Sequence, residues 1–338
     1  MTPEKSDHFD GKRFFNPNGA AVQPLTAVPR MLLTKRTPWP AHIEESPRLQ
    51  PPLDGADAVI TFIGHATFLI QTPAGHILTD PMYSLRAGPL NTFGPRRVRR
   101  PAVPFEDLPP ISTVLLSHNH YDHCDLPTLR RLARRFNPVV VTPIGNGRLV
   151  QSAGISRVEE LDWWQSAQLP AVPITLTPAH HFSARGPFDR NRALWSGFMM
   201  VIAGRRIYFA GDTAYGPFLH DVRQRLGPID LALLPIGAYE PRWFMKSVHM
   251  NPAEAVQAHV DLDASRSIAM HFGTFQLTAE GIDDPLHALT QALDARAIPR
   301  SRFSIPGSGE SVFVGHHGIA RVGDRAATDT THGIHSQE

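Results

Sequence analysis

Residues 115–125 read LLSHNHYDHCD, and this stretch decides most of what the sequence says about fold and chemistry. It begins inside an apolar run, STVLLSH at 112–118, which is typical of a buried strand. The polar residues come directly after that run, in a loop at a strand's end, where rigid scaffolds commonly carry active-site residues. Four of them are of the types that bind metal ions, namely His118, His120, Asp122 and His123.

The spacing of these four residues favours a metal site over a histidine-rich surface loop. His118 and His120 are two residues apart, so in extended backbone their side chains face the same side. Asp122 and His123 follow after the chain turns, and they can reach a second point in space. Imidazole and carboxylate are the ligands that zinc takes when one coordination position stays open for water.

Further candidate ligands follow other strand-like runs. His180 and His181 come after ITLTPA, Asp212 ends RIYFAGD, and His271 ends SIAMH. Several strand ends could therefore converge on one rim, and together with the first cluster these residues complete two sites. An aspartate between two metal ions can bridge them, which suits Asp212. At the double histidine only one residue is expected to be a ligand, because adjacent residues on extended backbone point apart.

The rest of the chain alternates strands with helices. We expect strands at 58–72 (with a turn before 76), 76–81, 139–143, 174–178, 197–204, 206–212, 230–239 and 267–273. We expect helices at 126–136, 218–227, 251–262 and 283–295, the third of them capped by Asn251 with Pro252 at its first position. Two packed sheets covered by helices would fit this order.

Composition limits the class of protein. Of 338 residues, 42% are hydrophobic and 19% are charged, which suits a folded chain of one large domain or two small ones. The net charge of +2 makes nucleic acid an unlikely partner. The one cysteine, Cys124, excludes a disulfide within the chain and is compatible with a reducing compartment. We see no signal-peptide pattern and no long apolar run, so we expect a cytoplasmic protein that can still dock peripherally on a membrane.

Three stretches are expected along the chain. Residues 1–56 are rich in proline and polar residues, which predicts an extended N-terminal arm, either laid over the domain or mobile. Residues 57–322 carry the strands, helices and candidate ligands, and we interpret them as the folded domain that holds the site. Residues 323–338 are expected to form a mobile tail.

The segment SHNHYDHCD resembles the HxHxDH signature of the metallo-β-lactamase superfamily. The resemblance implies an α+β fold, an αββα sandwich of two mostly antiparallel or mixed sheets flanked by helices, with the metals at one edge. Segments such as GHATFLIQ, LTDPMYS, GPRRVRRP, FAGDTAYG and GAYEPRWFM look like the branch that hydrolyses N-acyl-phosphatidylethanolamine by phospholipase D chemistry. Even DGKRFFNP near the N-terminus resembles that branch, and the likeness spans roughly residues 10 to 280.

The resemblance also implies roles for particular residues. The first zinc ion would be held by His118, His120 and His181, and the second by Asp122, His123 and His271, with Asp212 bridging the two. At the double histidine the family's ligand matches His181, and His180 is the alternative. Asp80 in LTDP and His65 in GHA would support the ligands from a second shell. His249 would lie near the reacting centre, as a substrate-binding or catalytic group.

The implied enzyme is a phosphodiesterase with two zinc ions per chain, which would act on a phospholipid through a hydroxide shared between the metals. We expect Asp122 and His249 to take part in catalysis, and His249, Arg96 and Arg97 to bind substrate. GPRRVRRP could attract anionic headgroups, or its arginines could be ordinary loop charges. The resemblance also suggests a homodimer.

Three alternatives stay open from the sequence. A lactonase or a nuclease of the same fold would use the same centre on another substrate. The same ligand set could hold iron in an electron-transfer enzyme, although no flavodoxin-like segment accompanies it here. A non-catalytic scaffold would be expected to lack some of the ligands, and all seven are present.

Overall fold

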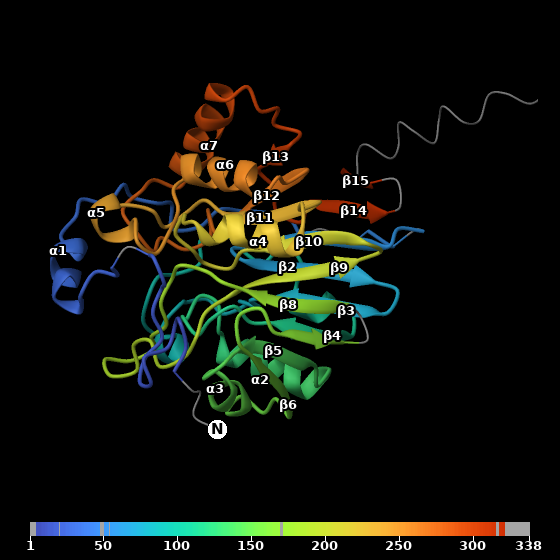
Figure 1. Cartoon of the computed structure of the whole chain (residues 1–338), viewed down its shortest axis with the longest axis horizontal. Helices are drawn as coiled ribbons and strands as arrows, with labels where there is room; N and C mark the ends of the chain where they lie inside the picture. The colour runs from blue at the N-terminus through green and yellow to red at the C-terminus, as the bar shows by residue number, and fades with distance from the viewer. Residues whose placement is uncertain are drawn as a thin grey trace, which may run out of the picture.

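Two packed β-sheets form the centre of the computed structural model, which describes residues 5–19, 21–47, 51–53, 55–169, 172–315 and 318–321 (Figure 1). The first sheet has the strand order β15-β14-β1-β2-β3-β4-β5-β6, and the second has the order β13-β12-β11-β10-β9-β8-β7. The strands of the first sheet are β1 Ala58–Gly64, β2 Thr67–Thr72, β3 Gly75–Thr79, β4 Ile111–Leu115, β5 Val139–Pro143, β6 Arg157–Leu161, β14 Ser311–Gly315 and β15 Gly318–Arg321. Those of the second are β7 Ser166–Gln168, β8 Pro173–Thr177, β9 Gly197–Ile202, β10 Arg205–Phe209, β11 Leu231–Pro235, β12 Arg266–Met270 and β13 Phe303–Ser304.

Both sheets are mixed. In the first, β1, β2 and β3 pair antiparallel, whereas β3, β4, β5 and β6 are parallel to one another. In the second, β7 to β10 are antiparallel and β10 to β13 are parallel. The predicted α+β sandwich of two mixed sheets flanked by helices is therefore confirmed.

Helices cover the outer faces of the two sheets. The α-helices are α1 Val28–Leu32, α2 Leu126–Arg135, α3 Gly147–Gln151, α4 Phe218–Leu226, α5 Arg242–Met245, α6 Pro252–Asp261 and α7 Asp284–Ala295. Residues of α2 and α3 share a buried cluster with the first sheet, and residues of α4, α6 and α7 pack with the second. Figure 1 shows α2 and α3 at the bottom of the view and α6 and α7 at the top.

The central strands are apolar on both faces because both faces are covered. In β1, Ile60 and Phe62 belong to the cluster shared with the second sheet, whereas Ile63 belongs to the cluster beneath α2. In β2, Ile70 belongs to the cluster shared with the second sheet and Leu69 to the cluster beneath α2, because successive side chains of a strand point to opposite faces. These strands are near-continuous apolar runs for that reason.

The helix ends follow the sequence signals closely. The predicted cap of α6 is present, with the Asn251 side chain accepting from Glu254 N and the Glu254 side chain accepting from Asn251 N. Loss of such a cap costs about 1 kcal/mol of stability. In α2, Leu129 and Leu132 are buried beneath the arginine-bearing face, which agrees with the predicted amphipathic helix.

The described part of the N-terminal arm lies on the domain. It is mostly irregular, as the proline content predicts, although it includes the short helix α1, which the sequence analysis did not predict. The main chain of Ile43 donates to Val98 O, and that of Thr37 donates to Ala279 O. The tail expected at 323–338 lies outside the described residues. In the described part of the chain, no helix combines the length and apolar character that a membrane crossing requires.

Candidate metal centre

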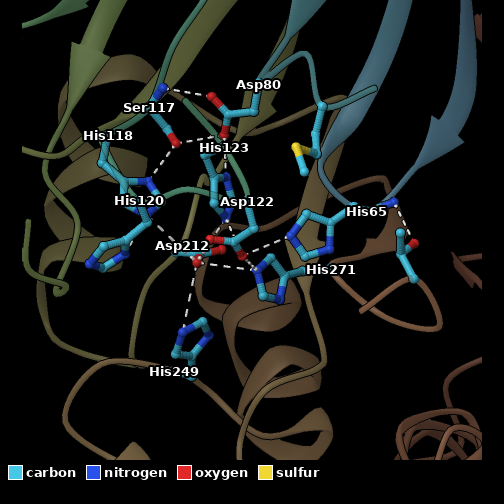
Figure 2. A network of polar contacts seen from close by, with 12 residues as sticks. His65, Asp80, Ser117, His118, His120, Asp122, His123, Asp212, His249 and His271 are labelled. Carbon is cyan, nitrogen blue, oxygen red and sulfur yellow. Dashed lines mark hydrogen bonds and ion pairs between the residues drawn. The ribbon is translucent and has the colours of Figure 1, made fainter. Parts of the chain in front are cut away.

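Side chains from loops after β1, β3, β4, β10 and β12 meet at one rim of the sandwich (Figure 2). His181, from the loop after β8, reaches the same rim. The strands that carry most of them run parallel to a neighbour, so their carboxyl ends lie at the same edge of each sheet. The structure brings together all seven predicted ligands and the three predicted supporting groups, namely His65, Asp80, His118, His120, Asp122, His123, His181, Asp212, His249 and His271.

The two sheets approach each other closely at this rim. Ser196 N donates to Ser117 O over 3.0 Å, which joins the start of β9 to the end of β4. Gly211 has φ +61°, and a Cβ there would lie 2.8 Å from Ser196 O and 2.9 Å from Ser117 Cβ. A glycine is required at this position, because a side chain would push Asp212 away from the histidines that follow β4.

Three histidine nitrogens form the first ligand set. His120 Nδ1 lies 2.9 Å from His118 Nε2 and 3.1 Å from His181 Nε2. His118 and His181 are buried, and His120 is partly exposed. Three imidazole nitrogens around one point are a donor set that could hold a metal ion.

The second ligand set combines a carboxylate with two histidines. Asp122 Oδ2 lies 3.4 Å from His123 Nε2 and 3.3 Å from His271 Nε2. Both ring nitrogens of His271 and Nε2 of His123 are buried and form no hydrogen bond with the described residues. Polar atoms left in this state usually have an unseen partner, and a metal ion would be a suitable one.

One oxygen of Asp212 lies between the two sets. Its Oδ2 is 3.1 Å from His123 Nε2 and 3.2 Å from His271 Nε2. The same atom is 3.9 Å from His118 Nε2 and 3.8 Å from His181 Nε2. The residues present therefore fit a metal centre in which this carboxylate oxygen lies between the two ligand sets.

Asp80 orients one histidine of each ligand set, His123 directly and His118 through Ser117. Its carboxylate accepts from Ser117 N at 2.7 Å and from Ser117 Oγ at 2.6 Å, and it contacts His123 Nδ1 at 2.7 Å. Ser117 Oγ is in turn 2.9 Å from His118 Nδ1. A carboxylate on the far nitrogen of a histidine orients the ring and raises its basicity as a ligand.

The backbone at the rim is strained at three polar residues. His65, Asp80 and His271 have φ values of 58°, 33° and 60°, in the left-handed region that glycine normally occupies. His65 Nε2 lies 2.9 Å from Asp122 Oδ2, so its side chain reaches the second ligand set. Such strain persists where the surrounding structure over-determines the conformation, and it concentrates at functional sites.

The two adjacent histidines after β8 point to different places. His181 Nε2 faces the first ligand set, and its Nδ1 is 2.8 Å from Val248 O. The His180 ring packs on Phe218, with the centroids 4.6 Å apart. His181 therefore faces the first ligand set, whereas the His180 ring lies against Phe218.

Burial and crowding keep the first ligand set neutral in the metal-free chain. Burial lowers the pKa of His120 to about 3 and that of His181 to about 4. Burial, reinforced by the neighbouring His123 and His120, holds the pKa of His118 well below its usual range. Neutral imidazole is the form that binds a metal.

Opposite charges set the pKa values in the second ligand set. Burial by itself would raise the pKa values of Asp122 and Asp212, but the positive charge of the nearby His123 holds both well below their usual range. Burial lowers the pKa of His271, whereas Asp212 and Asp122 raise it, to about 9 in sum. A metal ion would take the place of the protons held between these carboxylates.

The remaining predicted site residues are placed differently. His249 Nε2 lies 3.7 Å from Asp212 Oδ2, and its buried Nδ1 has no hydrogen-bond partner in the described chain. Arg96 is exposed, but Arg97 is buried, donating to Met82 O at 2.5 Å and to Ser84 O at 3.2 Å. The Arg97 guanidinium also stacks on Phe275, so the protein itself already occupies its donors.

Sequence reasoning missed Arg185, which stabilises the main metal-binding loop. Its Nη1 donates to Asn119 O and to Cys124 O, both over 2.8 Å, and its guanidinium lies 3.9 Å from the Tyr121 ring centre. It therefore ties together the turn that separates His120 from His123. An arginine 61 residues from Cys124 carries no spacing signal that could have indicated this contact.

The chain matches known proteins in sequence and in fold. Residues 76–272 match the family model described as a beta-lactamase superfamily domain. The chain is 39% identical over 249 residues to an N-acyl-phosphatidylethanolamine-hydrolyzing phospholipase D of Caenorhabditis elegans, covering 70% of each protein. A mitochondrial phospholipase D of the same description from Saccharomyces cerevisiae is 36% identical over 220 residues, which cover 63% of this chain and 47% of the yeast protein.

A solved structure supports the fold. A possible metal-dependent hydrolase from Veillonella parvula superposes with a TM-score of 0.62 at 19% identity, covering 77% of this chain and 100% of that one. At that identity the likeness concerns the fold alone, whereas the family match spans more than half of the chain. The chain therefore belongs to the beta-lactamase superfamily and is a hydrolase with the metallo-β-lactamase fold.

Proposed function

We propose that the chain is a dinuclear zinc phosphodiesterase of the phospholipase D type, acting on N-acyl-phosphatidylethanolamine or a closely related lipid. The observation that supports it most is the position of Asp212 Oδ2, which lies within 3.9 Å of ligand nitrogens from both sets. The substrate class rests on the similarity to the worm and yeast phospholipases.

The two zinc ions, when bound, would lower the pKa of a water molecule to about 7 and neutralise charge on the phosphodiester oxygens. The chain's own residues hold and orient the centre. Asp80 keeps Ser117 and His123 in place, while His65 reaches Asp122. His249 Nε2 lies 3.7 Å from Asp212 Oδ2, so the ring would stand beside a phosphate bound at the centre.

The balanced reaction is simple hydrolysis. A water oxygen forms a new bond to phosphorus, and the bond between phosphorus and the ethanolamine oxygen breaks. The water proton ends on the departing alkoxide, which leaves as N-acylethanolamine, and phosphatidate remains. No covalent enzyme intermediate is required. Cys124 is unsuited to act as a nucleophile, because burial raises the pKa of its thiol to about 12.

A panel of substrates tests this function. Zinc-loaded protein should release N-acylethanolamine from N-acyl-phosphatidylethanolamine in mixed micelles, and it should also cleave bis(p-nitrophenyl) phosphate. Metal content should be about two zinc ions per chain. Cleavage of the aryl diester alone would discard the lipid substrate, and hydrolysis of lactones alone would establish the lactonase alternative. RNA cleavage would point to the nuclease.

A membrane contact is proposed for the loop that follows β3. Leu90 is 88% exposed and Phe93 is 66% exposed, and Arg96 beside them is exposed too. The loop is tied to the metal-binding segment, because Ser84 N and Ser84 Oγ both donate to the Asp125 carboxylate. Apolar tips beside basic residues suit the surface of an anionic bilayer.

Replacing Leu90 and Phe93 together by serine is expected to weaken binding to phosphatidylglycerol vesicles by more than tenfold, because about 0.8 kcal/mol is lost per buried methylene. Turnover of lipid in vesicles should fall in parallel, while cleavage of the soluble aryl diester stays unchanged. Val260→Ser on α6, where the side chain is 46% exposed, serves as the matched control. Equal vesicle binding by the double variant and the wild type would contradict the proposed contact.

A further inference from the structure

The segment of the N-terminal arm formed by residues 5–19 packs beside the first ligand set, and we call it the N-terminal clamp. Phe9 and Phe14 are 5% and 2% exposed, and their ring centres lie 4.6 Å apart. They share a buried cluster with Trp163 and Trp195. The clamp is thus held to the domain by buried aromatic packing, although it ends about 40 residues before β1 begins.

Main-chain contacts fix the register of the clamp on the domain. Phe14 N donates to Asn191 O over 2.8 Å, and Asn191 Nδ2 donates back to Phe14 O over 3.0 Å. At the other end of the clamp, His8 Nε2 lies 2.7 Å from Asp162 Oδ1, and the His8 ring stacks on Trp163. These contacts therefore hold Asn16, two residues after Phe14, at a defined place.

The Asn16 side chain forms hydrogen bonds with both main-chain polar groups of His181. Its Nδ2 donates to His181 O over 2.9 Å, and its Oδ1 accepts from His181 N over 3.3 Å. The same Oδ1 accepts from Trp195 Nε1 over 3.0 Å. A side-chain amide carries the donor and the acceptor that a main-chain peptide group needs, so Asn16 acts as a one-residue strand partner for His181.

Asn16 completes the restraint of this ligand. Thr213 Oγ1 accepts from His180 N, and His180 O accepts from Ala214 N, so the preceding residue is held from the side of β10. The His181 ring is oriented by its contact to Val248 O. His181 is buried, and within the described residues its main-chain N–H and C=O groups both form hydrogen bonds with the Asn16 side chain.

We infer that Asn16 is a positioning residue for the first metal ion, through which the N-terminal clamp sets the place of His181. The inference rests on the proposed metal centre, which it deepens. A buried main-chain group that loses its hydrogen-bond partner must shift or stay unsatisfied, and both outcomes cost free energy. A shift would move His181 Nε2 away from His118 and His120, and an unsatisfied main chain would hold His181 in place less firmly. A ligand set assembled less well binds its ion more weakly, whereas the second set does not depend on His181.

The test measures zinc affinity rather than turnover. Metal-free wild type, Asn16→Ala and Asn16→Asp are titrated with zinc against a chromophoric chelator, and bound zinc is counted by mass spectrometry. Asn16→Ala is expected to weaken one of the two ions about 10–100-fold, as loss of groups that support a ligand commonly does. The second ion should keep its wild-type affinity. Asn16→Asp should behave alike, because a carboxylate cannot donate to His181 O.

Gln23→Ala is the matched control. Gln23 also belongs to the arm and also donates from a side-chain amide to a main-chain oxygen, that of Trp243, over 3.2 Å. It should leave both zinc affinities unchanged. Wild-type affinities in both Asn16 variants, or an equal loss in Gln23→Ala, would overturn the inference. If Asn16→Ala does not fold, Asn16→Asp decides alone.

The outcome separates this inference from the proposed reaction. A wild-type chain that binds two zinc ions and cleaves no phosphodiester overturns the proposed function, while a selective loss of one ion in the Asn16 variants still supports the clamp. A wild-type chain that cleaves lipid, with Asn16 variants that bind zinc normally, overturns the clamp alone. A wild-type chain that binds no zinc overturns both.

Discussion

Replacement of Asp212 by alanine is expected to lower kcat for phosphodiester cleavage by at least about 10³-fold, more than the loss of a single stabilising donor in an active site. Its Oδ2 lies near nitrogens of both ligand sets, so the substitution removes a ligand from each. It also leaves His123 and His271 without one of the two carboxylates that both face. Bound zinc should fall from about two ions per chain to one or fewer, as measured by mass spectrometry alongside steady-state kinetics.

Two further variants make this result specific. Asp212→Asn keeps the shape and one oxygen but removes the charge, so it should retain more zinc than Asp212→Ala while remaining strongly impaired. Asp263→Asn is the control, because that exposed carboxylate pairs with Arg223 on the surface and lies outside the centre. Full activity in Asp212→Ala would contradict the dinuclear mechanism.

Removal of the metal is expected to lower the melting temperature by on the order of 10 °C. Each ion bound at a thousandfold excess over its Kd contributes about 4 kcal/mol, and each kcal/mol corresponds to about 2–4 °C in a chain of 150–250 residues. The buried cluster offers a structural reason, since Asp122 and Asp212 are held ionised among crowded histidines that a metal ion would organise.

Differential scanning calorimetry with and without a strong chelator measures this effect. Added zinc should restore the original transition, and calcium should not, since imidazole-rich sites disfavour it. In Asp212→Ala the chelator should shift the transition much less, because less metal is bound at the start. An unchanged melting temperature after verified loss of metal would show that the cluster is stable without ions.

Parts of the fold were predictable because local signals and tertiary packing agree. The Asn251–Pro252 pair predicts the start of α6, since the cap and the fixed φ of proline both act within one turn. The apolar run before His118 predicts a buried strand for a similar reason, because a strand covered on both faces needs apolar residues throughout. The helix α1 was not predicted, since five residues in a proline-rich arm form no periodic pattern.

The arginines of GPRRVRRP lie in environments that the sequence pattern does not distinguish. GPRRVRRP presents its arginines as equivalent, but the alternation of the extended chain turns Arg96 outward and Arg97 inward. Arg97 is then held by the main-chain oxygens of Met82 and Ser84. The sequence could not distinguish these environments, because they depend on main-chain oxygens that lie 13 and 15 residues upstream of Arg97.

The sequence by itself determined which residue types stand at the ends of which strands, and hence the candidate ligands from His118 to His271. That much is local, because strand patterns and ligand spacings are set by neighbours along the chain. Only the tertiary structure decided that Asp212 Oδ2 lies between the two sets, that His181 rather than His180 faces them, and that Asn16 holds His181. These relations join segments from both sheets and the arm, and their distances depend on how close the packed sheets approach, which no single segment encodes.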